Sequence, residues 1–244
     1  MSTQTKHERL AEAIRQRIET GEYTDQMPSE AELTAEFGYS RSTVRQAFTS
    51  LENEGLIVAH SGSRRQIQRG RRWYWPMSSW ENSHTAEADA WAVSIREQGG
   101  TPSAEVSVHI EEAKPDIARA LRIEPGDRVV VRRRVRLVNG EPHQLADSYF
   151  PFWLAEQHSV FLQPGDLSAS GGLLASVGLP QARYLDEISA RMPTPSEAQQ
   201  LKASRGIPLI VHSRTGFHAD ERPLRHMVTL MTADRVHVCY ELEP

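Results

Sequence analysis

The spacing of apolar residues predicts two helices at the start of the chain. Within residues 6–20 apolar side chains recur every four positions, which places them on one helix face. They are Leu10, Ile14 and Ile18. Gly21 is a suitable C-terminal stop. A second, short helix is expected between Ser29 and Gly38, because Ser29 and Glu32 have the spacing of a capping box.

A third helix is expected directly after Ser40, which is a good N-cap residue. Its buried face follows the i, i+3, i+4, i+7 pattern of Val44, Ala47, Phe48 and Leu51. Its opposite face begins with donors that suit phosphates and base edges. These are Arg41, Ser42, Thr43, Arg45 and Gln46. Two short helices joined by a tight turn form a helix-turn-helix, whose second helix enters the DNA major groove.

A β-hairpin should follow the helices. Residues 56–58 are apolar and predict a short strand, Gly62 offers a turn, and Ile67 lies where a second strand would return. The first third is therefore predicted to be a winged helix-turn-helix, mainly α with a β-wing. Residues 60–72 contain no acid and are rich in arginine, which predicts an anion-binding surface. Their arginines are Arg64, Arg65, Arg69, Arg71 and Arg72.

The apolar period changes to two in the remaining chain, which predicts strands. The strands are expected at 106–110, 129–138, 143–150, 182–192, 208–218, 223–232 and 236–242. Helices are expected at 87–99, after Pro115, within 168–177 and from Thr194 to Leu201. Asn139-Gly140 is a hairpin signal. The order indicates a mostly antiparallel sheet of about six strands with helices on one side, an α+β fold.

We expect a DNA-binding domain at 1–70, a linker at 71–86 and a second domain at 87–244. The linker contains Trp73, Tyr74 and Trp75. These aromatic residues either anchor the linker on the second domain, which is the favoured interpretation, or stack on bases. In the second domain Arg132, Arg134 and Arg136 lie on one face of a strand. That face is either solvated, paired with acids or part of an anion site.

Composition narrows the function classes. The chain has 244 residues, a net charge of −4 and one cysteine, Cys239. An intramolecular disulfide is therefore impossible, which fits the cytoplasm, and Cys239 is expected in the core. No apolar run approaches a membrane span, and the polar start lacks the apolar core of a signal peptide. No nucleotide, metal or catalytic motif is present, so we expect no cofactor, no metal and no catalytic residue.

The stretch MPSEAELTAEFGYSRSTVRQAFTSLENEGLI resembles the DNA-binding domain of the GntR family of bacterial regulators, through PSE, SRSTVRQA and L-x-x-E-G-L-I at family spacing. The resemblance implies that these arginines and hydroxyls contact DNA and that the wing reaches the minor groove. The DNA-binding candidates are Ser29, Ser40, Arg41, Ser42, Thr43, Arg45, Gln46, Gly62, Arg64 and Arg65. Ala31 replaces a frequent family arginine. Arg64 replaces the second wing glycine, which strengthens minor-groove contact or reshapes the wing tip.

Residues 75–244 resemble the UTRA effector domain of the HutC subfamily, whose fold is similar to chorismate lyase. The matching stretches are RVRLVNGEP, ADSYFP, PTPSEAQQL and ADRVHVCYE. The resemblance implies that an R-x-R strand and a helix start bind the anionic part of an effector. The effector-binding candidates are Arg134, Arg136, Ser168, Ser170, Gly171, Arg225 and Tyr240. Arg225 lies near the position where some sugar-phosphate sensors have a glutamate, which favours a more anionic ligand. Tyr240 lines the pocket or belongs to the core.

The two resemblances predict a homodimeric transcriptional repressor that a small anionic effector releases from a palindromic operator. Two alternatives stay open. One is a DNA-binding regulator that responds to no ligand, and the other is an enzyme similar to chorismate lyase. A ligand-induced shift of the melting temperature separates the first alternative from a sensor. Release of 4-hydroxybenzoate from chorismate identifies the second.

Overall fold

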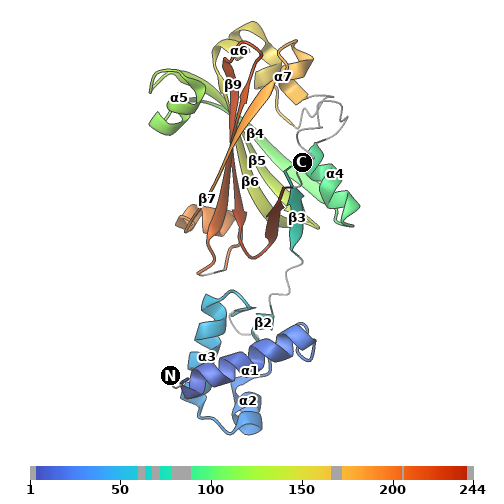
Figure 1. The fold of residues 1–244 in the computed structure, drawn as a ribbon, viewed down its shortest axis with the longest axis vertical. Coiled ribbons are helices and arrows are strands. Elements are labelled where there is room, and N and C mark those ends of the chain that lie inside the picture. The colour runs from blue at the N-terminus through green and yellow to red at the C-terminus, as the bar shows by residue number, and fades with distance from the viewer. Residues whose placement is uncertain are drawn as a thin grey trace. The chain divides into compact units, whose positions relative to one another are not determined.

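The computed structural model describes residues 4–59, 64–67, 72–77, 89–165, 172–204 and 206–240. They form two compact units, each with its own hydrophobic core (Figure 1). The first comprises Met1–Arg71 and Met192–Pro208, and the second Arg72–Arg191 and Leu209–Pro244. Of the helices in the described ranges, none combines the length and the apolarity needed to cross a bilayer.

Three helices form the first unit as predicted. They are α1 (Lys6–Thr20), α2 (Glu30–Phe37) and α3 (Arg41–Asn53). The predicted capping box of α2 is present, Ser40 caps α3, and Gly21 and Gly38 end α1 and α2 in the left-handed conformation. The apolar stripes of the helices meet in one core, which includes Leu10, Ile14, Leu33, Phe48 and Leu51. The unit also contains α8 (Pro195–Gln200), whose capping box at Thr194 was predicted.

The wing is a small antiparallel sheet. Strand β1 (Ile57–Val58) pairs with β2 (Gln66–Ile67), with Ile57 opposite Ile67. The segment before α2 lies against β2, because the Met27 amide donates to the Arg65 carbonyl at 2.8 Å and the Ile67 amide to the Asp25 carbonyl at 2.9 Å. The predicted hairpin strands are therefore confirmed. Gly62, expected at the turn, lies outside the described residues.

The second unit is built on a six-stranded antiparallel sheet with the order β4-β5-β6-β9-β8-β7. The strands are β4 (Pro102–Glu112), β5 (Arg128–Val138), β6 (Glu141–Pro151), β7 (Arg183–Arg191), β8 (Leu209–Phe217) and β9 (Pro223–Thr232). Asn139 and Gly140 both have positive φ, as a tight β5–β6 turn requires. The predicted antiparallel α+β architecture is confirmed.

Helices cover both faces of this sheet, so the expectation of helices on one side is wrong. Helix α5 (Pro115–Leu121) packs on the face that contains Val129 and Val131. Helices α6 (Trp153–Gln157), η3 (Ser159–Leu162) and α7 (Gly172–Ser176) pack with Val130 and Phe150 on the other face (Figure 1). Consecutive valines at 129–131 are apolar on both faces of β5, and each face therefore needs a cover.

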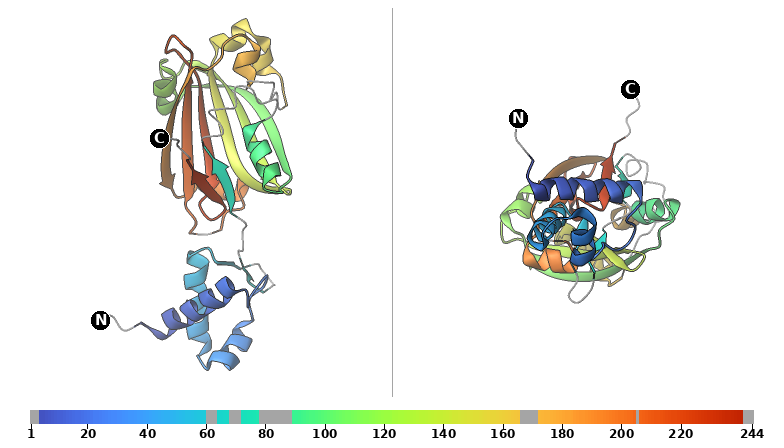
Figure 2. Two further views of the ribbon diagram at one scale, coloured as in Figure 1. Left: turned by 45° about the vertical axis from the view of Figure 1, so that its right-hand side comes forward. Right: turned by 90° about the horizontal axis from the view of Figure 1, so that it is seen from below.

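The aromatic segment of the expected linker forms a strand. Strand β3 (Trp73–Pro76) pairs in parallel with β10 (Val236–Cys239), apart from the six-stranded sheet, and α4 (Ala90–Glu97) lies beside it (Figure 2). Trp73 and Trp75 are buried and Tyr74 is 58% exposed. The aromatic run thus has the period of a half-buried strand. Cys239 is exposed on β10, so the expectation of a core cysteine is wrong.

The arginine row of β5 is not a solvated face. Arg132 is fully buried, and its guanidinium donates to the carbonyls of Phe161 (3.1 Å), Gln163 (2.8 Å) and Gly165 (2.6 Å). These carbonyls belong to the end of η3 and the chain after it, where no helical partner is available. Arg132 therefore fixes this chain segment on the sheet.

We predict that Arg132→Met lowers the free energy of unfolding of the second unit by about 3 kcal/mol, because three carbonyls lose a charged donor that is itself fully buried. All five tryptophans lie between residues 73 and 153. Tryptophan fluorescence during urea denaturation of the full chain therefore reports on this unit. Arg119→Met, on the exposed side of α5, is the control and should change little. A loss for Arg132→Met that is no larger than the control's would contradict this role.

Acid should destabilise the second unit through His143. Burial lowers the pKa of His143 to about 4, and the positive charges of Arg235 and Arg136 add to the effect. His143 therefore becomes protonated only near pH 4 in the folded state, whereas in the unfolded chain it becomes protonated below about pH 6.5. We predict that stability is highest above this pH and falls by about 3 kcal/mol as the pH drops from 6.5 to 4. His143→Gln should show a smaller fall in urea denaturation across this range, and an identical fall would contradict the prediction.

Candidate DNA-binding surface and ligand cavity

The exposed face of α3 carries the predicted DNA-binding residues. Val44, Ala47, Phe48 and Leu51 face the core, while Arg41, Ser42, Arg45, Gln46 and Thr49 are exposed. This division follows from the helical period, since each turn places one apolar and one polar group on opposite sides. Among the described residues, none makes a polar contact with the side chain of Arg41 or Gln46. Their donors face solvent.

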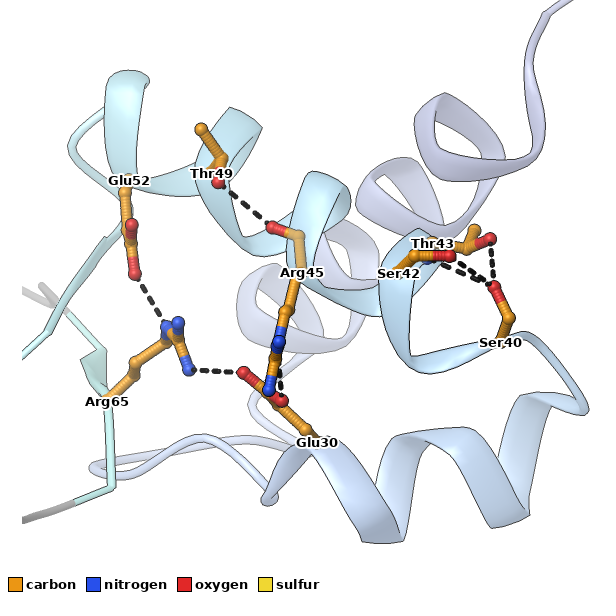
Figure 3. A network of polar contacts seen from close by, with 8 residues as sticks. All are labelled: Glu30, Ser40, Ser42, Thr43, Arg45, Thr49, Glu52 and Arg65. Carbon is orange, nitrogen blue, oxygen red and sulfur yellow. Dashed lines mark hydrogen bonds and ion pairs between the residues drawn. The ribbon is translucent and has the colours of Figure 1, made fainter.

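The start of α3 presents a cluster of hydroxyl groups. The Ser40 hydroxyl lies 2.8 Å from that of Ser42 and 2.9 Å from that of Thr43, and it accepts a hydrogen bond from the Thr43 amide at 3.3 Å (Figure 3). The N-terminus of a helix carries a positive partial charge and unsatisfied amide donors. This end of α3 is therefore suited to a DNA phosphate.

Glu30 links the recognition helix to the wing. One carboxylate oxygen lies 2.9 Å from Nε of Arg45 and the other 3.7 Å from Nη1 of Arg65 (Figure 3). The Nε of Arg65 also donates to Glu52 at 2.6 Å, and its guanidinium lies 4.2 Å from the centre of the Phe48 ring. Arg45 is 67% exposed and Arg65 only 26%. Arg45 is thus open to DNA, whereas Arg65 is held mainly by the protein.

The remaining candidates of this surface also have protein partners. Arg64 pairs with Glu32 at 2.9 Å. Glu32 closes the capping box of α2, because it accepts from the Ser29 amide at 2.7 Å while its own amide donates to the Ser29 hydroxyl at 3.2 Å. The bond from the Ser29 amide is the main reason why the pKa of Glu32 is lowered. The Ser29 side chain therefore serves as a cap in this structure.

Sequence reasoning did not find Glu30 and Glu52. Both occur in the stretches that carry the resemblance, PSE and LENEG. An acid in the first turn of a helix is already accounted for by the helix dipole, so the sequence offered no reason to assign Glu30 a further role. The signal that could have indicated one was the number of arginines on the neighbouring wing, because these need counter-charges when DNA is absent.

The second unit contains a cavity of about 210 Å³ between the sheet and α7. Its lining combines apolar side chains with three polar ones, an amide, a phenol and a guanidinium. The lining residues are Phe150, Gly172, Leu173, Leu174, Ala175, Pro180, Gln181, Tyr184 and Arg225. Of the effector-binding candidates that the structure describes, Arg225 alone belongs to this lining. Gln181, Tyr184 and Phe150 were not predicted, since only the fold brings β6, β7, β9 and α7 together here.

Arg225 lies at the cavity with weak protein partners. Its Nε and Nη2 donate to the Ser148 hydroxyl at 3.2 and 2.9 Å, and Nη2 contacts the sulfur of Met227 at 2.9 Å. Within the described ranges no carboxylate pairs with it. Burial, together with the positive charges of Arg134 and Arg136, lowers the pKa of Arg225 to about 9. It therefore remains a cation at neutral pH.

The other effector-binding candidates have different positions. Arg136 is 5% exposed and pairs with Asp89 at 2.6 Å, at the start of α4. Arg134 is partly exposed on the same sheet face. Tyr240 follows β10, is 46% exposed and does not line the cavity. Ser168, Ser170 and Gly171 lie outside the described residues.

A donor-rich recognition helix beside a wing, joined to a second unit with a ligand-sized cavity, defines a DNA-binding transcriptional regulator. Residues 6–67 match the family model of bacterial regulatory proteins of the gntR family, and residues 97–237 match the UTRA domain. The chain belongs to the gntR family and carries a UTRA domain.

Relatives resemble this chain over almost its whole length. It is 31% identical over 237 residues to an uncharacterized HTH-type transcriptional regulator of Rhizobium meliloti, covering 95% of this chain and 93% of the relative. It is 26% identical to the HTH-type transcriptional repressor NagR of Bacillus subtilis, covering 93% and 90%. The crystal structure of PhnF from Mycobacterium smegmatis has a TM-score of 0.58 at 19% identity, covering 96% and 99%, and shows the same fold.

We predict that Arg45→Ala weakens binding to a DNA duplex selected from a random library by the wild-type protein. A lost contact to a base costs about 1–3 kcal/mol, or roughly tenfold to over a hundredfold in affinity. If Arg45 contacts phosphate instead, the slope of the logarithm of affinity against the logarithm of salt concentration should also decrease in magnitude by about one. Fluorescence anisotropy at several salt concentrations measures both quantities. Arg9→Ala, on the exposed side of α1, is the control. Wild-type affinity in Arg45→Ala would overturn the docking of α3.

Proposed function

We propose that this chain is a homodimeric transcriptional repressor of the HutC subfamily that binds a palindromic operator and is released by a small anionic effector. It acts in the bacterial cytoplasm, where its DNA target lies. The exposed donors of α3 read the operator, Arg64 and Gly62 belong to the wing that follows the minor groove, and the effector binds in the cavity of the second unit. The NagR relative, described as a repressor, supports the sign of regulation.

The observation that carries the ligand part is Arg225. A guanidinium taken out of water without a carboxylate is costly, and that cost is met when an anion binds beside it. Arg225 lines a cavity that is open to a small molecule. DNA binding alone does not require a cavity lined by such a guanidinium. Its presence therefore supports a regulator that responds to a ligand over one that does not.

Release from DNA follows from linkage. If the effector binds more tightly to a conformation with low operator affinity, it shifts the population away from DNA. The operator then weakens effector binding by the same factor. A homodimer with two-fold symmetry presents two α3 helices, and a palindrome presents two matching half-sites. The named relatives are transcriptional regulators, which supports this function over an enzyme similar to chorismate lyase.

We predict that the selected operator is an inverted repeat and that two chains bind each duplex. Analytical ultracentrifugation of the complex measures the number of chains. A duplex with a single half-site should bind about 100-fold more weakly or worse, because the second contact of the dimer is lost. One chain per duplex, or equal affinity for the half-site, would show that the dimeric palindrome is wrong.

A further inference from the structure

The cavity of the second unit has one charged residue in a lining that is part apolar and part polar. Arg225 supplies the charge, while the apolar part of the wall consists of Phe150, Leu173, Leu174, Ala175 and Pro180. A sugar phosphate would bring several hydroxyls and three phosphate oxygens, each of which needs a hydrogen-bonding partner. Three side chains of this lining offer such groups, those of Gln181, Tyr184 and Arg225, which is fewer than a sugar phosphate needs. Its volume of about 210 Å³ is also below that of pockets for drug-sized ligands.

Tyr184, which belongs to the cavity lining, is held in place by Arg214. The guanidinium of Arg214 lies 4.8 Å from the centre of the Tyr184 ring. Arg214 donates to both oxygens of Asp186 at 2.7 and 2.8 Å, and His212 lies 2.6 Å from the same carboxylate. Burial raises the pKa of Asp186, but hydrogen bonds from His212 and Arg214 outweigh it and hold the pKa at about 2. Tyr184 is therefore preorganised by a charged pair that persists at physiological pH.

Gln181 provides a second polar group at the cavity. A Cβ on Gly216 would lie 2.6 Å from the Gln181 amide carbon, so glycine at this position allows the amide to lie directly on β8. The Gln181 carbonyl oxygen is buried and accepts no hydrogen bond from the described residues. This acceptor needs a donor from a bound molecule, which a carboxylate cannot supply and a hydroxyl elsewhere on an acid can.

We propose that the cavity binds a small carboxylic acid with an apolar body, whose carboxylate pairs with Arg225 and whose body lies between Phe150 and the start of α7. The proposal rests on the proposed function, because it names the class of its effector. A planar carboxylate matches the fork of one guanidinium and needs few further donors. Tyr184 and the leucines of α7 then contact the carbon skeleton.

A panel of matched ligands tests this class with the full-length protein. Butyrate, benzoate, phenylacetate and 3-phenylpropionate are compared with the corresponding alcohols, with inorganic phosphate and with glucose 6-phosphate. Isothermal titration calorimetry should show binding of at least one aromatic acid. Its alcohol should bind at least about tenfold more weakly, because it lacks the charge-assisted bond. Equal or tighter binding of phosphate or glucose 6-phosphate, or no binding of any acid, overturns the proposal.

Two variants and a control locate the site. Arg225→Gln should lose about tenfold or more in affinity for the acid, and Ala175→Phe should lose it by filling the cavity. Arg119→Gln, on the exposed side of α5, should bind as the wild type does. Circular dichroism and thermal unfolding confirm that each variant folds. Unchanged affinity in Arg225→Gln places the acid elsewhere and overturns the proposal.

The ligand class and the regulatory function can fail separately. If an acid binds through Arg225 but operator affinity stays constant, the ligand class holds and the proposed release from DNA is wrong. If glucose 6-phosphate releases the operator in a manner that depends on Arg225, the release holds and the carboxylic acid class is wrong.

Discussion

A guanidinium that leaves water must find acceptors in the protein, and five arginines share one face of the six-stranded sheet. They are Arg132, Arg134, Arg136, Arg214 and Arg225. Arg132 binds three carbonyls and so fixes the chain after η3, Arg136 binds Asp89 at the start of α4, and Arg214 binds Asp186. Each pairing attaches a covering element or orders a neighbouring strand. Within the described part of the chain, Arg225 contacts a hydroxyl, a sulfur and the Phe150 ring but no carboxylate, and it lines the cavity. The packing of this face and its candidate ligand site thus have the same physical origin.

Local signals explain why the first unit could be predicted closely. Capping boxes, glycine stops and apolar stripes lie within a few residues of the positions they control. The strands of the six-stranded sheet and β10 were also predicted, because alternation is a local pattern. The helices on both faces of the sheet were not predicted, although three consecutive valines in β5 make both faces apolar there. The pairing of β3 with β10 joins segments some 160 residues apart, and no local pattern encodes it.

The candidate sites differ in predictability for the same reason. The donors of α3 occur in consecutive turns of one helix, so the sequence alone places them together. The cavity draws on β6, β7, β9 and α7, and its Gln181 and Tyr184 have no distinguishing sequence context. Arg225 was predicted only through a family resemblance. Arg136 was predicted for the ligand but has a carboxylate partner from α4, a contact that depends on how α4 packs against the sheet.

The ion pairs beside the recognition helix are compatible with DNA binding, although the net charge of the protein is −4. The Arg45–Glu30 pair is exposed on its arginine side, and such pairs contribute about 1 kcal/mol or less. Exchange of Glu30 for a phosphate or a base edge therefore has a small free-energy cost. Arg65 differs, because two carboxylates and the Phe48 ring hold it at the base of the wing. Since Glu30 contacts both arginines, release of Arg45 to DNA leaves Glu30 available to Arg65. The wing can then stay in place while the recognition helix takes up its DNA contacts.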